Sequence, residues 1–164
     1  MIIMKKCLGL LLTGMSILGG RATQAQTSDK AYLLNESAIG VDKAAVRATR
    51  DFWQRAGEQK EEQWYKTSQG YVAEYAAGPV KARFVYNQKG DWVYSILTYG
   101  EKGLPEEVRK EVRSEYYDYG ITWVKEVNEG DVVVYVVHLE DEASWKEVAV
   151  QDGEMRVLKA MCKQ

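Results

Sequence analysis

Histidine and cysteine are scarce in this sequence of 164 residues. His138 is the only histidine, and Cys7 and Cys162 are the two cysteines. A zinc site needs about four ligands, mostly nitrogen or sulfur, and these side chains cannot supply them without carboxylates. The sequence also has no glycine-rich phosphate loop and no serine in a nucleophile-elbow pattern. We therefore predict a protein with no catalytic residues, no cofactor and no bound metal.

Three groups could still carry chemistry, and each has a simpler structural interpretation. His138 lies in an alternating strand pattern, where a sheet histidine is more common than a general base or ligand. Residues 140–142, Glu-Asp-Glu, have oxygen ligands for calcium but lack the spacing and glycine of a dedicated loop, which favours a solvated turn. Cys162 has no second cysteine or activating base beside it. A hydrolase is therefore disfavoured.

A long hydrophobic run is also missing. The apolar stretch at residues 7–18 follows two lysines and is too short to span a bilayer, which takes about 20 apolar residues. This pattern predicts a signal peptide over residues 1–25, with cleavage before Gln26. Cys7 precedes the apolar run, so it is badly placed for lipid attachment. We predict a periplasmic or secreted protein with no stable membrane insertion after cleavage.

The charge balance argues against nucleic acid as a partner. The formal net charge is -2, and loss of the predicted signal peptide takes it to -5, because that segment carries three basic residues and no acidic one. Binding to a phosphate backbone draws its affinity from clustered lysine and arginine. The length of the mature chain suits one domain or two small fused units that share a sheet, and its single cysteine allows no disulfide within the chain.

Turn residues divide the mature chain into short elements. Residues 26–40 show no period and form a predicted leader. Apolar residues then recur every three or four positions from Val41 to Phe52, which predicts an amphipathic helix. Gly90 suits a hairpin turn because glycine readily adopts positive φ. Strands rich in β-branched and aromatic residues are predicted at 64–68, 71–77, 80–87 and 91–99.

The same order of elements then begins again. Pro105 suits the first turn of a second helix, because its missing N–H breaks no hydrogen bond there. Gly120 is expected to end this helix. Its apolar face is predicted to consist of Leu104, Val108, Val112, Tyr116 and Tyr119. Four more strands are predicted at 121–127, 131–139, 144–150 and 154–162.

Matching residues in the two halves indicate a divergent duplication. The matched pairs are Trp64 with Trp123, Tyr75 with Tyr135, and Gly90 with Gly153, at separations of 59, 60 and 63. The predicted repeats are 41–103 and 104–164, and their alignment would turn Glu147 towards the helices. We predict an α+β fold in which two tandem α-β-β-β-β repeats form one antiparallel sheet of about eight strands, with the helices packed on one face.

Three stretches resemble the PepSY-like proteins, small secreted or periplasmic proteins that are also described as similar to the β-lactamase-inhibitor fold. The stretches are YNQKGDWVYS, the run beginning LPEEVRKEV, and VAVQDGEMRVL. The clear match spans about residues 80–158. The resemblance implies an antiparallel sheet with helices on one face and suggests binding or inhibition of other proteins. It implies no catalytic residue.

Aromatic residues are abundant, with five tryptophans and eleven tyrosines. Helices on one side of a sheet can cover only one of its faces, so half of the strand positions must face elsewhere. If Tyr135 points to the helices, then Val132, Val134, Val136 and His138 point away from them. This apolar stripe suggests a partner surface, with coverage by the leader or by a second protomer as the alternative.

Two hypotheses of function follow. The first is a non-enzymatic binding module that engages, and in some cases inhibits, a protein partner through the open sheet face, with Trp92, Tyr94 and Trp145 as anchors. The second is a carrier that holds a small apolar or peptide ligand between the sheet and the helices, which requires a preformed cavity there.

Overall fold

A computed structural model describes residues 32–33, 42–59 and 61–163. The predicted signal peptide lies outside the described residues, as does the predicted leader except for Tyr32 and Leu33. Among the described residues, neither helix is long and apolar enough to cross a membrane.

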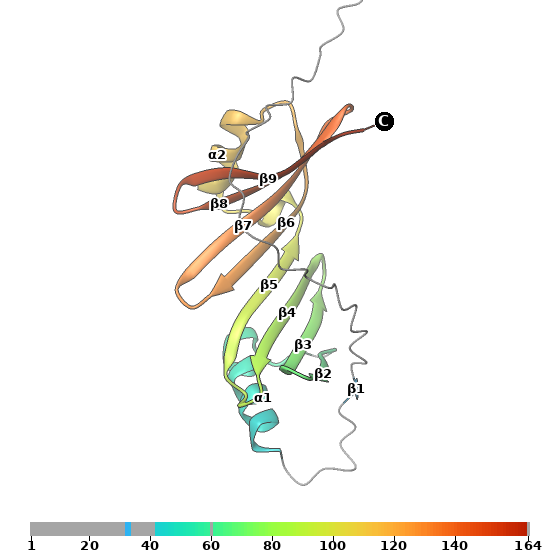
Figure 1. Cartoon of the computed structure of the whole chain (residues 1–164), viewed down its shortest axis with the longest axis vertical. Helices are drawn as coiled ribbons and strands as arrows, with labels where there is room; N and C mark the ends of the chain where they lie inside the picture. The colour runs from blue at the N-terminus through green and yellow to red at the C-terminus, as the bar shows by residue number, and fades with distance from the viewer. Residues whose placement is uncertain (1–31, 34–41, 60, 164) are drawn as a thin grey trace, which may run out of the picture.

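The chain runs twice through a helix followed by four strands (Figure 1). The first half contains α1 (Lys43–Ala56), β2 (Gln63–Thr67), β3 (Gly70–Ala77), β4 (Val80–Asn87) and β5 (Trp92–Tyr99). The second half contains α2 (Glu106–Glu115), β6 (Gly120–Glu129), β7 (Val132–Glu140), β8 (Ser144–Gln151) and β9 (Glu154–Cys162). A short 3-10 turn, η1 (Glu101–Gly103), precedes α2. The predicted α+β architecture is confirmed.

All strands belong to one antiparallel sheet in chain order. β1 (Tyr32–Leu33) adds two residues beside β2, and each later strand pairs with the one before it. The two halves join where β5 pairs with β6, from Ser95 opposite Asn128 to Tyr99 opposite Val124. The sheet twists strongly between the halves, so that β8 and β9 cross the direction of β3 and β4 in Figure 1.

Each helix covers its own half of the same sheet face. In the first half, the ring of Phe52 on α1 is fully buried and meets Phe84 edge-on, with ring centroids 5.2 Å apart. In the second half, Val112 on α2 packs with Val124, Val137 and other aliphatic residues of β6 to β8. Leu97 on β5 contacts both clusters, so the two cores are continuous.

The second helix is shorter than the sequence predicts. It begins at Glu106 after Pro105 but ends at Glu115, and Gly120 is the first residue of β6. The chain turns between these points, because the Tyr119 N–H donates to the Tyr116 carbonyl at 3.2 Å. Arg113 donates to the Tyr119 carbonyl at 2.6 Å and holds this turn against the helix.

Gly90 fixes how α1 sits on the sheet. It has φ +80°, and a Cβ atom at this position would lie 2.1 Å from the carbonyl oxygen of Ala44. Only glycine therefore lets the β4–β5 turn reach the first turn of α1. The left-handed conformation expected for Gly90 is present.

Asp42 joins the start of α1 to the sheet. Its carboxylate accepts hydrogen bonds from the backbone of Ala44 at 3.1 Å and from the hydroxyl of Tyr71 on β3. Lys66 on β2 lies 3.1 Å from the same carboxylate. The Tyr71 hydrogen bond, and then the Lys66 ammonium, lower the pKa of Asp42 from 3.8 to about 2.

We predict that Asp42→Asn changes how stability responds to acid. Asparagine still caps the helix but carries no charge. Because the pKa of Asp42 is lower when folded, its carboxylate contributes fully above about pH 4, and this contribution disappears as the pH falls to about 2. Urea unfolding of both proteins should therefore give a stability difference at neutral pH that shrinks over this range. A difference that stayed constant would contradict the role of the charge.

Tyr99 and Glu126 form a hydrogen bond on the helix side of the β5–β6 junction. The Tyr99 hydroxyl donates to Glu126 at 2.7 Å, and Asn128 donates to the other carboxylate oxygen at 3.1 Å. The Tyr99 side chain is buried. Burial, together with the neighbouring carboxylate, raises the pKa of Tyr99.

We predict that Tyr99→Phe destabilises the fold by about 1–3 kcal/mol, since it removes a hydrogen bond to a charged group at a partly buried site. Tyr65→Phe is the matched control, because the Tyr65 hydroxyl donates to Gln63 at an exposed position. Urea denaturation measures both. Equal stability losses in the two variants would show that the Tyr99 hydrogen bond has no special weight.

Candidate functional site

The open side of β6, β7 and β8 carries a group of valines and aromatic rings, of which Val132 is 47% exposed. In the strand register, Val134 of β7 lies opposite Val127 of β6. Val136 of β7 lies between Lys125 of β6 and Ala149 of β8. Tyr135 packs into the helix-side core, so the predicted outward direction of Val132, Val134 and Val136 is consistent with the alternation. We call the surface formed by Trp123, Val127, Val132, Val134, Val136, His138 and Trp145 the valine–tryptophan face.

Three rings stack across neighbouring strands on this face. Trp123 of β6 and His138 of β7 are nearly parallel, with centroids 4.8 Å apart. Trp145 of β8 stacks on the other side of His138 at 5.4 Å. Lys125 places its ammonium 4.8 Å from the Trp123 ring centre. The rings support one another, so the column presents a large contact area at a low cost in side-chain entropy.

Glu147 stands beside this column. It lies opposite His138 in the β7–β8 register, and its carboxylate is 3.9 Å from His138 Nδ1 and 3.7 Å from Lys159 Nζ. The inward orientation expected from the alignment of the two halves is therefore wrong. The reason is that β8 keeps strict alternation from Trp145 to Val148, and Val148 belongs to the core.

The three predicted anchors do not share one face. Tyr94 and Trp145 lie on the open side, but Trp92 packs into the first core, where the Arg55 guanidinium lies 4.0 Å from its ring centre. A bulge causes this: Val85 pairs with Tyr94 and Tyr86 pairs with Trp92, which leaves Val93 as the extra residue. The prediction that Trp92 is an anchor on the open face is therefore wrong, because its side chain lies on the helix side.

A second bulge brings Trp123 to the open face. Register shifts between Ile121 and Trp123, so Trp123 lies opposite His138 while Ile121 faces the core. Its counterpart Trp64 lies on the helix side against Phe52. The sequence contains no signal for this shift, so the stack of Trp123 with His138 was missed. The alternation of β7 did predict His138 and Val136 on the same side, and the register of β6 with β7 is consistent with it.

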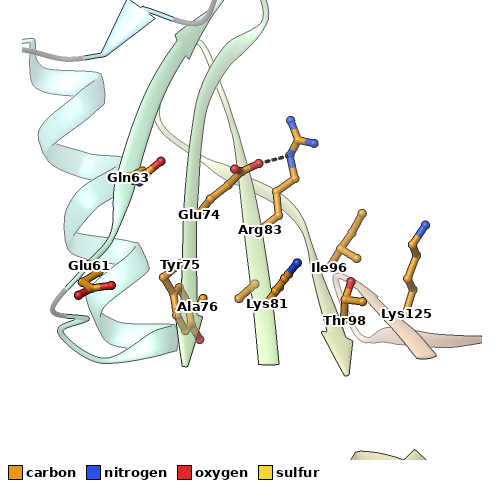
Figure 2. A pocket seen from close by; sticks show the side chains of 11 residues that line it. Glu61, Gln63, Glu74, Tyr75, Ala76, Lys81, Arg83, Ile96, Thr98 and Lys125 are labelled. Atoms are coloured by element: carbon orange, nitrogen blue, oxygen red, sulfur yellow. Dashed lines mark ion pairs between the residues drawn. The ribbon is translucent and has the colours of Figure 1, made fainter. Parts of the chain in front are cut away.

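A central groove of about 530 Å³ adjoins the valine–tryptophan face. Figure 2 shows Ile96 and Thr98 of β5 beside Lys125 of β6, with Arg83 reaching Glu74 across β3 and β4. The Arg83–Glu74 distance is 3.3 Å, and both side chains are well exposed, so this pair adds little stability. Ile96 lies opposite Val127 and makes the groove continuous with the apolar surface.

The acidic turn between β7 and β8 has structural partners. Asp141 accepts a hydrogen bond from the Ala143 N–H at 2.8 Å, and Glu140 pairs with Lys163 at 2.7 Å. Lys163 lowers the pKa of Glu140. Within the described residues, no group of three or more histidine, cysteine, aspartate or glutamate side chains could hold a metal ion.

The carrier hypothesis requires a cavity between sheet and helices. Besides the central groove, a pocket of about 450 Å³ lies at the β8–β9 turn and one of about 400 Å³ lies near Asp42 and Lys66. None of these three is enclosed between a helix and the sheet. The geometry therefore favours the open face over an internal ligand site.

Comparison with known proteins gives likeness at the level of fold. No family model and no curated protein matches the chain. Similar solved structures include a DUF2874 family protein from Bacteroides ovatus, with TM-score 0.56 and 16% identity, covering 71% of this chain and 85% of that one. A BLIP-like protein from Bacteroides fragilis is similar with a TM-score of 0.56 and 13% identity, and the match covers 71% of this chain and 84% of that one.

A third similar structure is a protein from Bacteroides eggerthii that is provisionally described as periplasmic. It gives a TM-score of 0.55 and 14% identity, covering 76% of this chain and 90% of that one. The chain therefore has the BLIP-like fold, in agreement with the PepSY-like and β-lactamase-inhibitor-like resemblance of its sequence.

Proposed function

We propose that this chain is a periplasmic or secreted, non-enzymatic module that binds a protein partner through the open face of its sheet. The observation that carries the proposal is the valine–tryptophan face, where aliphatic and aromatic side chains lie together without a covering helix. Tryptophan contributes strongly to protein interfaces because it buries a large area and loses little entropy.

The neighbouring groove adds polar recognition to this apolar surface. Lys81, Arg83 and Lys125 surround it, with Glu74 paired to Arg83. Interfaces commonly combine a desolvated apolar centre with a charged rim that sets orientation and specificity. The BLIP-like fold of the Bacteroides fragilis protein is in keeping with a binding role.

We predict that Trp145→Ala and Val134→Lys each weaken partner capture. Loss of a central tryptophan contact costs about 2 kcal/mol, or roughly thirtyfold in affinity. The protein would be immobilised and exposed to the envelope and secreted fractions of its source at low and high salt. Retained proteins would be identified by mass spectrometry and their affinity then measured with each variant. If a retained partner is an enzyme, its activity in the complex tests inhibition.

Two control variants lie away from the open face. Trp53→Ala and Val46→Lys alter α1 residues that are 48% and 44% exposed. They make the same chemical changes, so they separate loss of the binding surface from a general loss of apolar area. Circular dichroism checks that all four variants fold. Equal capture by site and control variants would refute the placement of the binding surface on the open face.

Export gives a further prediction. The sequence predicts removal of residues 1–25, so the protein recovered from the periplasm or medium should begin at Gln26. Intact mass spectrometry measures the start of the chain directly. Replacing the two lysines at positions 5 and 6 by glutamate should reduce export, because a signal peptide needs a positive amino-terminal region. A recovered chain that still begins at Met1 would contradict cleavage.

A further inference from the structure

β9 forms one edge of the sheet. It pairs with β8 along its length, and β9 is last in the strand order of the described part of the chain (Figure 1). An edge strand presents backbone N–H and C=O groups that another strand can pair with. At nine residues, β9 is long enough to offer a full set of such groups.

The side chains of β9 separate sharply by face. Those on the helix side are apolar and lie opposite helix-side positions of β8: Met155, Val157, Ala160 and Cys162. Those on the open side are mainly charged: Glu154, Arg156, Lys159 and Met161. Only Met155 packs against the core, whereas Val157 remains 51% exposed. The apolar side of β9 therefore extends past the area that α2 covers.

The spacing of the apolar helix-side residues along β9 is the same in both chain directions. A bulge at Leu158 shifts the register between Val157 and Lys159, so the apolar positions are symmetric about the middle of the strand. Two antiparallel copies of β9 can therefore pair with matching faces around an axis between Leu158 and Lys159. Met155 then lies opposite Cys162 of the partner subunit, and Val157 opposite the partner's Ala160.

We propose that two copies of this chain associate through antiparallel pairing of their β9 strands, which joins the two sheets into one. The pairing places the apolar side chains of the two strands together on the helix side. The helix side of one strand thus continues into the helix side of the other without any change in the fold. The interface is isologous, as in most symmetric dimers. It is separate from the valine–tryptophan face.

Site-specific cross-linking tests this register. In Met155→Cys, the new thiol faces Cys162 of the partner subunit, and directly opposite residues of antiparallel strands are close enough for a disulfide. Oxidation with copper(II) phenanthroline should give a dimer that dithiothreitol separates. A bond between positions 155 and 162 of one folded chain is impossible, because the seven residue-to-residue steps between them span about 23 Å along the strand.

Two proteins serve as controls for cross-linking. Arg156→Cys puts a thiol on the opposite side of β9, and the unmodified chain places its two Cys162 residues at opposite ends of the interface. Neither should form the dimer at the rate of Met155→Cys. A monomeric Met155→Cys protein, or equal cross-linking in all three, would overturn the proposed pairing.

Sedimentation equilibrium tests association without cross-linking. The unmodified protein should show a concentration-dependent monomer–dimer equilibrium, and Val157→Lys should raise its dissociation constant by about tenfold or more, because it places a lysine in the apolar contact. Val132→Lys is the matched control: Val132 is 47% exposed but lies on the valine–tryptophan face. Val132→Lys should leave dimerisation unchanged and weaken partner capture. The experiment can therefore contradict dimerisation through β9 without contradicting partner binding by the valine–tryptophan face, and the reverse. A protein that remains monomeric at several hundred micromolar, or dimerises equally well with Val157→Lys, overturns this proposal.

Discussion

The pairing of β5 with β6 is the constraint on which the rest of the structure depends. Five residue pairs join the halves there, and Tyr99 and Glu126 add a hydrogen bond across the junction on the helix side. Because strand pairing fixes which side chains share a face, this junction puts α1 and α2 on the same side of the sheet. Leu97 contacts both cores, so the two halves form one folded unit. The open face is a direct consequence, since two helices on one side leave the other side of every strand without a helix.

The two halves use this open face differently. In the first half, Glu74, Lys81 and Arg83 make the surface polar, and the central groove lies there. In the second half, valines and the stack of Trp123, His138 and Trp145 make it apolar. His138 is the middle ring of this stack. The sequence offered only two interpretations of it, an ordinary sheet residue or a general base or ligand. The combination of an apolar centre with a charged border is the composition on which the proposed binding role rests.

The regular parts of the fold could be predicted from the sequence, and the irregular parts could not. Alternating apolar residues located β7 and the direction of Val134, while the three-to-four spacing located α1 and the buried Phe52. Both patterns follow from backbone geometry alone. Trp92 and Trp123 were unpredictable because each lies next to a bulge, where one extra residue reverses the faces that follow. A bulge depends on how two strands fit together, so neither strand's own sequence identifies it.

The bulges account for the main differences in surface chemistry between the halves. At Val93, the bulge turns Trp92 into the first core beneath Arg55 and removes an aromatic side chain from the polar half of the open face. Near Thr122, the bulge moves Trp123 out to His138 and completes the aromatic column in the second half. At Leu158, a third bulge makes the apolar pattern of β9 symmetric. Because a bulge changes the direction of side chains without changing topology, one strand order can carry an aromatic stack on its open face and a symmetric apolar pattern on its edge strand.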